Sequence, residues 1–386
     1  MDATVGKLNP RPRALVLLTQ TYADGGIQRF NRTFLSACGL INADCDVLSL
    51  GDAEESRSRW QQPPSVSIRV FNYDKVRFAL AAAARLLRGD YDFVIIGHVN
   101  FLELVAVCNA CRPVRNRRVM LIAHGIEVWS SLGTRRMRAA MRQVDLTLSV
   151  SRYTRDRIRA QIPRLPVERF TVFPNALSET WTGKFNPNTR GPEPAGLPER
   201  FILSVTRLDR GDRYKGVPAV IEALAMLADR SVHYVIAGSG DDSEFLRGLV
   251  KRFGLDERVH FIGAVTDAQL AVVYRKCACF VLPSGKEGFG LVFLESMFFG
   301  APVIAARAKG AVDVVRHEQT GLLVDYGDAA ALSATIARVL EDSELCDRLR
   351  KGGYAVVTGD GEFTYRAYVA RLANLLGVVS LDVAAR

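Results

Sequence analysis

The stretch Pro-Ser-Gly-Lys-Glu-Gly-Phe-Gly-Leu-Val-Phe-Leu-Glu-Ser, residues 283–296, decides how the second half of this 386-residue chain folds. The four apolar residues before it, which end at Leu282, are typical of a buried strand. The segment 291–299 is apolar enough for a packed helix, and Gly300 and Pro302 would end that helix. A strand, a glycine-bearing turn and a helix N-terminus are therefore expected in succession.

Such a turn predicts a binding site for an anion. The amides of Gly290, Leu291 and Val292 would point at the anion, with the positive end of the helix dipole behind them. Gly288 and Gly290 would let the backbone approach a ligand closely.

Two carboxylates bracket the turn, Glu287 at its mouth and Glu295 eight positions later. A carboxylate beside an anion site would repel the anion, so both side chains are better suited to accept hydrogen bonds from hydroxyl groups. A phosphate in the middle with hydroxyls on either side describes a sugar nucleotide.

The spacing of Glu287 and Glu295 resembles the Glu-x7-Glu pattern of the retaining glycosyltransferases of family 4, which have the GT-B fold. The likeness extends through Met297 and over residues 301–305. It implies two Rossmann-like, doubly wound α/β domains that face each other across a cleft. It also implies metal-independent transfer of a hexose, without a cofactor, from a nucleotide sugar of the GDP-mannose or UDP-glucose type. The acceptor would be a glycan or a lipid-linked oligosaccharide in polysaccharide biosynthesis. The resemblance implies that the donor is held by Glu295 and by the turn residues Gly288, Phe289, Gly290, Leu291 and Val292, and that Glu287 is catalytic.

Alternating apolar strands and helical segments predict the same architecture in both halves of the chain. We expect an N-terminal domain over 1–185, a proline- and glycine-rich linker over 186–198 and a C-terminal domain over 199–358. The segment 359–386 is expected to be a helix that, by the resemblance, crosses back to the first domain. Strands are expected near 14–19, 46–50, 67–71, 93–97, 118–123, 146–150, 171–173, 201–205, 233–237, 260–262, 278–282, 302–305 and 321–324.

Two cations follow the first strand of the second half. Arg207 and Lys215 suit a diphosphate, since arginine binds it with two donors and lysine adds a point charge. Alone, they are better interpreted as surface cations of a basic loop. The family's Arg…Lys-Gly element reverses that preference and implies a catalytic role for both.

Further glycines follow other strands. Gly25 and Gly26 match the family's N-terminal glycine loop, and Gly238 and Gly240 match its nucleotide-side turn. A dinucleotide fingerprint would need glycine where Ser243 stands, so an NAD-dependent enzyme is disfavoured.

The motif His-Gly-Ile-Glu-Val-Trp begins at His124, after another expected strand. A lone histidine in this position is often a satisfied structural residue. In the resembled family a histidine here reaches the donor sugar, which implies a catalytic role for His124. Glu127 and Trp129 are candidates for contact with the acceptor.

The charge of the chain is unevenly distributed. Residues 1–180 hold 26 basic and 16 acidic residues, and this excess equals the net charge of +10 of the whole chain. The aromatic interleaving of a nucleic-acid platform is missing, so an anionic membrane surface or a pyrophosphate-bearing acceptor fits better. Arg135, Arg138 and Arg142 lie on one face of a short helix and Met137, Met141 and Val144 on another, which predicts peripheral membrane binding. Arg112, Arg115, Arg117 and Arg118 lie nearby in the sequence.

The remaining features predict a cytoplasmic enzyme at the inner face of the membrane. The sequence lacks an apolar run of membrane-spanning length and a secretory signal. Seven cysteines without paired spacing favour a reducing compartment, and the pair Cys108 and Cys111 is expected in the core. Two Asp-x-Asp sequences introduce strands, so no metal site is assigned. Two alternatives stay open, a sugar-nucleotide epimerase of the same fold and a non-catalytic binding partner.

Overall fold

The computed structural model describes residues 11–111, 117–185 and 191–378. The chain divides into two units, one up to Asn175 together with the segment from Tyr365, and one over Ala176–Thr364. These boundaries differ from those expected near 185, 199 and 358. The expected linker over 186–198 lies partly outside the described residues, and the chain passes between the units at 175 and 364 instead.

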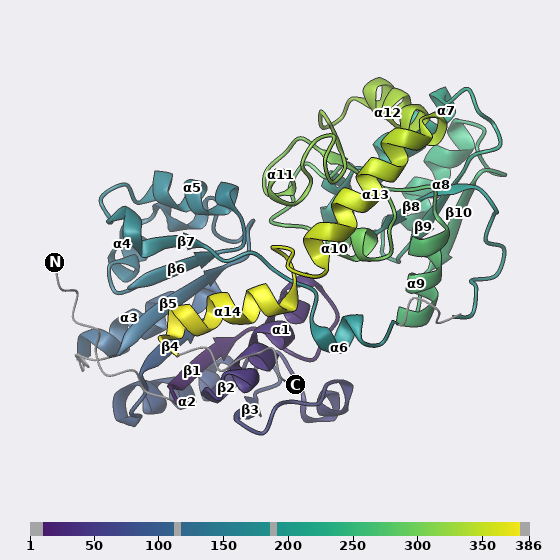
Figure 1. The fold of residues 1–386 in the computed structure, drawn as a ribbon. Helices are drawn as coiled ribbons and strands as arrows, with labels where there is room; N and C mark the ends of the chain where they lie inside the picture. The colour runs from purple at the N-terminus through teal and green to yellow at the C-terminus, as the bar shows by residue number, and fades with distance from the viewer. Residues whose placement is uncertain (1–10, 112–116, 186–190, 379–386) are drawn as a thin grey trace. The chain divides into compact units, whose positions relative to one another are not determined.

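The first unit, within the described residues, contains a seven-stranded sheet in the order β3-β2-β1-β4-β5-β6-β7, and all its pairings are parallel. Parallel neighbours need crossover connections, and helices supply most of them (Figure 1). Its strands are β1 Arg13–Leu18, β2 Asp44–Ser49, β3 Val66–Val70, β4 Phe93–Ile96, β5 Arg118–Ala123, β6 Leu146–Ser149 and β7 Phe170–Val172. Its helices are α1 Gly26–Leu40, α2 Lys75–Arg88, α3 Leu102–Cys111, α4 Arg135–Met141, α5 Arg152–Gln161 and α14 Tyr365–Leu376, with short 3-10 turns η1 Glu54–Arg59, η2 Val99–Phe101, η3 Ser131–Gly133 and η4 Val167–Arg169.

The second unit has the same plan. Within the described residues its sheet has six parallel strands in the order β10-β9-β8-β11-β12-β13. They are β8 Phe201–Val205, β9 His233–Ala237, β10 Val259–Gly263, β11 Cys279–Leu282, β12 Val303–Ala306 and β13 Leu322–Val324. Its helices are α6 Glu179–Thr182, α7 Val217–Met226, α8 Ser243–Arg252, α9 Asp267–Lys276, α10 Leu291–Phe298, α11 Ala311–Val314, α12 Ala329–Glu341 and α13 Ser343–Val357, and η5 is Arg210–Lys215.

Every expected strand is present, with ends that differ by at most two residues. The strands were predictable because residues of a parallel sheet covered on both faces are continuously apolar. The four residues of β4 and of β11 are all buried, for example. Helix starts follow ordinary capping chemistry: Ser151 caps α5, and Thr266 and Gln269 form a capping box at α9.

The last helix belongs to the first unit. In α14, Tyr368 is fully buried, and its ring centroid lies 4.6 Å from that of Phe173 and 6.3 Å from that of Phe30 in α1. Figure 1 shows α14, in yellow, beside α1. The residues that α14 buries are Tyr368, Val369, Leu372, Ala373 and Leu376.

Two expectations about the first unit are corrected. Met141 and Val144 are buried in its core, so the apolar face of α4 is not open to a bilayer. Arg117 is also buried and donates to the carbonyl of Leu86, so it is not part of a surface patch. Arg112 and Arg115 lie outside the described residues. No helix in the described part of the chain has the length and apolar character that crossing a membrane requires.

The prediction that Cys108 and Cys111 lie in the core is confirmed for only one of the two. All seven fall in the described ranges and are free, and Cys108 is buried. Cys111 is the last residue of α3 and is exposed, so the expectation that it is a core residue was wrong.

Candidate functional site

The order of strands in the second sheet marks where a ligand is expected. Its strand order reverses between β8 and β11, and ligands of open α/β sheets bind beyond the carboxyl ends of the strands at such a point. The loop after β8 carries Arg207 and Lys215, and the loop after β11 carries the turn 283–290. The fold therefore brings together the two motifs that the sequence singled out in this half.

The turn 283–290 leads into α10 as expected. Gly290 is the N-cap of α10 with φ +95°, and no side chain caps the helix. A Cβ on Gly290 would lie 2.4 Å from the ring of Phe293, so only glycine fits both the backbone angle and the space. The main chain of Leu291 and Val292 consequently forms an uncapped helix start at the end of the turn that follows β11.

A second loop supports this turn. The amide of Gly310 donates to the carbonyl of Glu287 at 2.9 Å. A Cβ on Gly310 would lie 1.9 Å from the carbonyl oxygen of Gly288, so the two segments touch backbone to backbone. The ring of Phe289 is buried and packs on Phe363 at 5.6 Å, and its expected contact with the donor stays a prediction.

Lys215 and Glu287 form an ion pair at the mouth of the turn. The Lys215 Nζ to Glu287 Oε2 distance is 2.7 Å, and the two side chains are 19% and 13% exposed. Lys215 ends η5, and Gly216 after it has φ +86°, where a Cβ would lie only 2.6 Å from the Pro283 carbonyl oxygen. The close packing of these two loops holds the cation against the carboxylate.

Arg207 lies in the same loop and is held differently. Its side chain is 71% exposed, and its Nη2 lies 2.8 Å from Oδ2 of Asp212, a carboxylate that is 9% exposed. Burial raises the pKa of Tyr214, and the hydrogen bond to Asp212 raises it further. Asp212 was missed by the sequence reasoning, because one acid in a strongly charged loop gives no signal of its own.

Glu295 lies inside the unit and not on an open surface. Its side chain is 1% exposed, and the Tyr274 hydroxyl donates to its Oε2 at 3.1 Å. The Tyr274 ring stacks on Phe299 at 5.8 Å. Tyr274 is a second residue that the sequence did not indicate. The ribose contact expected of Glu295 stays a prediction.

Gly238 and Gly240 follow β9 and let it approach the loop of Arg207. A Cβ on Gly238 would lie 1.8 Å from the carbonyl oxygen of Thr206, and one on Gly240 would lie 2.2 Å from the carbonyl carbon of Leu208. The amide of Leu208 donates to the carbonyl of Ser239 at 2.9 Å. Both glycines therefore support the segment that carries Arg207, and a donor contact by them stays a prediction.

In the first unit, the glycine loop starts α1. Gly25 is the N-cap of α1 with φ +149°, and a Cβ there would lie 2.3 Å from the side chain of Gln28. The preceding loop is held by Asp52, a buried carboxylate that accepts hydrogen bonds from the amides of Thr21 at 2.5 Å and Tyr22 at 3.1 Å. A Cβ on Gly26 would meet no atom of the described residues within 4 Å, so the main chain of Gly26 is accessible.

His124 follows β5 and is partly buried. Its Nε2 lies 3.2 Å from the carbonyl oxygen of Gly97, and its ring meets that of Phe30 edge-on at 4.8 Å. Burial lowers the pKa of His124, against a smaller raising effect of the Glu127 carboxylate. The imidazole is therefore held mainly in its neutral form near neutral pH.

Glu127 and Trp129 have structural contacts. Glu127 Oε1 accepts hydrogen bonds from the amides of His124 at 2.5 Å and Gly125 at 3.0 Å, which closes the turn after β5. The Trp129 indole is 8% exposed and donates to Thr154 at 3.1 Å. Nothing in these contacts supports the acceptor role expected for either residue.

Metal ligands do not gather in the described parts of the chain, where no group of three His, Cys, Asp or Glu side chains is placed to hold an ion. The acids of the two Asp-x-Asp sequences have other partners. Asp46 pairs with Arg85 at 2.6 Å, and Asp92 accepts the amide of Arg13 at 2.8 Å.

Each half of the chain matches a family model of glycosyltransferases. Residues 186–356 match the family model of glycosyl transferases group 1, and residues 24–180 match that of glycosyltransferase family 4. A GDP-mannose-dependent alpha-(1-6)-phosphatidylinositol monomannoside mannosyltransferase of Mycobacterium tuberculosis is 30% identical over 310 residues, which are 76% of this chain and 78% of that one.

Solved structures with the same fold are more distant in sequence. The Anabaena protein HepE in complex with UDP-glucose has a TM-score of 0.74 at 20% identity, over 94% of this chain and 99% of that one. Sucrose-phosphate synthase of Thermosynechococcus elongatus has a TM-score of 0.72 at 21% identity, over 95% and 98%. With the two parallel sheets, the Glu287–Glu295 turn and the matches over both halves, this chain belongs to the family 4 glycosyltransferases and has the GT-B fold.

Proposed function

We propose that this glycosyltransferase moves a hexose from a nucleotide-diphosphate sugar to a glycan or lipid-linked acceptor, with retention at the anomeric carbon. The observation that carries the proposal is the arrangement after β8 and β11. Lys215 and Glu287 are in contact at 2.7 Å beside the uncapped start of α10, and Arg207 projects from the same loop. A diphosphate is bound by cations and free amides, which Arg207, Lys215 and the start of α10 would supply. A sugar hydroxyl needs a hydrogen-bond acceptor, which Glu287 would supply.

The departing nucleotide diphosphate gains negative charge as the glycosidic bond lengthens. Arg207 and Lys215 would stabilise that charge together with the amides at the start of α10. Glu287 would accept a hydrogen bond from a sugar hydroxyl, and Glu295 from the ribose. His124 would contribute from the first unit as a neutral hydrogen-bonding group, in line with the lowered pKa.

The donor is proposed to be GDP-mannose or UDP-glucose. The mycobacterial relative is named as GDP-mannose-dependent, and HepE was solved with UDP-glucose. The same relative is named for action on a phosphatidylinositol monomannoside, which supports a lipid-linked acceptor and work at the inner face of the cytoplasmic membrane.

The test is an assay with each donor, radiolabelled in the sugar, with and without membrane lipid extract as a source of acceptor. Transfer of label to the lipid or glycan fraction only with acceptor supports the proposal. Consumption or isomerisation of donor without acceptor would indicate the epimerase alternative, and binding without turnover would indicate a non-catalytic partner. Nuclear magnetic resonance of the product's anomeric proton tests retention, and an inverted configuration would contradict that part.

A further inference from the structure

A carboxylate to which the proposed reaction gives no role lies beneath Arg207. Asp212 belongs to η5, and its side chain is 9% exposed. Its Oδ2 lies 2.8 Å from Nη2 of Arg207, and the Tyr214 hydroxyl donates a hydrogen bond to the same carboxylate. Burial and this hydrogen bond hold the pKa of Tyr214 above its ordinary value, so the hydroxyl keeps its proton. Asp212 therefore connects an exposed guanidinium to a partly buried tyrosine.

Tyr214 is itself fixed to the turn 283–290. Its carbonyl accepts a hydrogen bond from the amide of Gly285 at 2.8 Å. Two ammonium groups lie near its ring, with Nζ of Lys215 at 5.5 Å and Nζ of Lys286 at 5.6 Å from the centroid. Both distances are within the range over which an aromatic ring attracts a cation. The main chain and the ring of Tyr214 thus hold η5 to the turn that carries Glu287.

The other side of η5 is held by a second ion pair. Arg213 donates to both carboxylate oxygens of Asp242, at 2.7 and 2.6 Å, and Asp242 is 3% exposed. Asp242 is the N-cap of α8, and the Arg213 guanidinium lies 3.8 Å from the ring centroid of Phe245 on that helix. Two-donor pairs of this kind fix geometry as well as charge. With η5 anchored on α8 and on the turn before α10, Asp212 offers Arg207 a fixed point.

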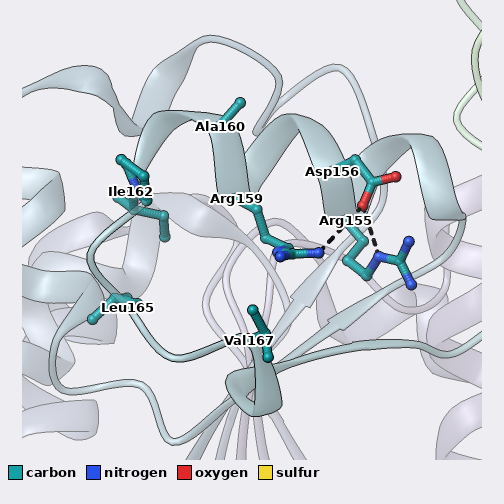
Figure 2. A pocket seen from close by; sticks show the side chains of 8 residues that line it. Arg155, Asp156, Arg159, Ala160, Ile162, Leu165 and Val167 are labelled. Atoms are coloured by element: carbon teal, nitrogen blue, oxygen red, sulfur yellow. Dashed lines mark hydrogen bonds and ion pairs between the residues drawn. The ribbon is translucent and has the colours of Figure 1, made fainter.

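An ordinary surface pair shows how this arrangement differs. On α5, Asp156 is 56% exposed, and Arg155 and Arg159 lie 2.9 and 3.9 Å from its Oδ1 (Figure 2). Such an acid is solvated with or without its partners, and pairs of this kind contribute little to stability. Asp212 is nearly removed from water, so its charge depends on the groups that contact it. Without Arg207 to neutralise it, this carboxylate would repel a diphosphate bound nearby.

We propose that Asp212 is a positioning residue, which orients the Arg207 guanidinium toward the departing diphosphate and is fixed in turn by Tyr214. The inference rests on the proposed function, in which Arg207 stabilises the charge of that diphosphate. Arg207 is 71% exposed, so its long side chain would otherwise adopt many rotamers. One ion pair limits these rotamers, and the remaining guanidinium donors stay available for phosphate oxygens. A charge oriented beforehand needs no rearrangement as the glycosidic bond breaks.

The charge of Asp212 has two effects of opposite sign. It repels the diphosphate and weakens binding, whereas its hold on Arg207 favours the transition state. Asp212→Asn keeps the size of the side chain and removes the charge. We expect kcat to fall by about 10- to 100-fold, as when a catalytic group is misplaced. The KM for donor and the Kd of GDP or UDP should be unchanged or lower, whereas general damage to the site would raise both.

Tyr214→Phe is the milder variant, because it removes only the hydroxyl that contacts Asp212. It should lower kcat in the same direction and by less. Two controls make the same change of charge as Asp212→Asn. Asp209→Asn alters an acid of the same loop that is 45% exposed and 3.8 Å from Nη1 of Arg207, and Asp156→Asn alters the surface pair on α5. Both should change kcat far less than Asp212→Asn does.

A double-mutant cycle shows whether Asp212 acts through Arg207. Adding Asp212→Asn to Arg207→Ala should cause no further loss of kcat, whereas independent effects would multiply. Multiplied losses overturn the proposal, and so does a normal or raised kcat in Asp212→Asn when Arg207→Ala is slow. A normal kcat in Arg207→Ala overturns instead the role of Arg207 in the proposed function, and the positioning role with it.

Chemical modification tests the contact without turnover. Phenylglyoxal modifies guanidinium groups, and mass spectrometry of the peptides locates each modified arginine. Asp212→Asn should raise the rate of modification several-fold at Arg207 and leave it unchanged at Arg210. An unchanged rate at Arg207 overturns the proposal even if no donor is turned over. Circular dichroism and chemical denaturation establish that each variant is folded.

Discussion

The Lys215 ammonium and the Glu287 carboxylate neutralise each other at 2.7 Å in a loop junction where both are largely buried. A pair of this kind is costly to break from one side, since the remaining charge is then buried without a partner. Donor binding would place a phosphate beside Lys215 and a sugar hydroxyl beside Glu287. We therefore expect the pair to hold the two loops together before donor binds.

Replacing Lys215 by methionine tests this view of the pair. We expect the variant to lose stability, by roughly the 3–5 kcal/mol found when one partner of a buried pair is removed, discounted for its partial exposure. The double variant Lys215→Met, Glu287→Gln should recover part of that loss. Chemical denaturation of the unchanged chain, the two single variants and the double variant measures these losses, and additive losses would show that the ion pair has little importance for folding.

Arg207→Ala should mainly reduce kcat, because the leaving diphosphate gains charge only as the bond breaks. The control is Arg210→Ala, three positions later in the same loop, whose side chain is 75% exposed and pairs with Asp241 only at 4.0 Å. Steady-state kinetics at varied donor concentration gives kcat and KM for both variants. An equal effect of both substitutions would indicate that Arg207 is only a surface cation of a basic loop.

Glu295→Gln should mainly raise the KM for donor, since a ribose contact is the same in the ground and transition states. The expected loss of donor binding free energy is about 0.5–1.5 kcal/mol, or somewhat more because the hydrogen-bond acceptor is charged. Tyr274→Phe removes only the 3.1 Å hydrogen bond to the same carboxylate and should have a smaller effect on KM. A fall in kcat with unchanged KM in Glu295→Gln would contradict the ribose assignment.

Activity should be unchanged by excess chelator, because Arg207, Lys215 and the amides at the start of α10 are proposed to neutralise the diphosphate. The assay compares turnover after treatment with EDTA and after later addition of Mg²⁺ or Mn²⁺. Collapse with EDTA and recovery with either ion would show that this assignment of charge neutralisation is wrong.

The lowered pKa of His124 predicts a pH dependence of stability. A histidine with a folded pKa below its ordinary value of 6.5 favours the folded state above that value and loses this contribution as pH falls through the folded pKa. Thermal unfolding between pH 7.5 and 5 should therefore show a smaller decline in His124→Gln than in the unchanged chain. His98 and His260 also have lowered pKa values, so the comparison rests on the difference between the two proteins. Parallel curves would contradict the prediction.

The strands and the turn before α10 were predictable because their signals are local. The four-residue apolar run of β11 and the glycines before α10 report burial and backbone angle directly, and both are present as expected. The contact between Lys215 and Glu287, 72 positions apart, is a consequence of the strand order and was visible only as two separate motifs.

The partners of individual side chains were less predictable, because the same residue type can bind a ligand in one place and stabilise a turn or the core in another. Glu127 caps the turn after β5, and Trp129 fills the core, although both stand in a family motif. Asp212 and Tyr274 gave no sequence signal, since a single acid or tyrosine gains meaning only from its neighbours in space. The amphipathic pattern of α4 was real, but its apolar face packs on the unit's own core.

The kinetics of Glu287→Gln test the central assignment most directly. Glutamine keeps the size of the side chain but lacks the charge, so it cannot pair with Lys215 or accept as strongly from a sugar hydroxyl whose carbon becomes electron-poor. With the donor that supports turnover, we predict a kcat lower by about 10²-fold or more, as for removal of a typical electrostatic stabiliser, with a much smaller change in the KM for donor. A folded Glu287→Gln variant with near-normal kcat and only a raised donor KM would contradict the catalytic role of this turn.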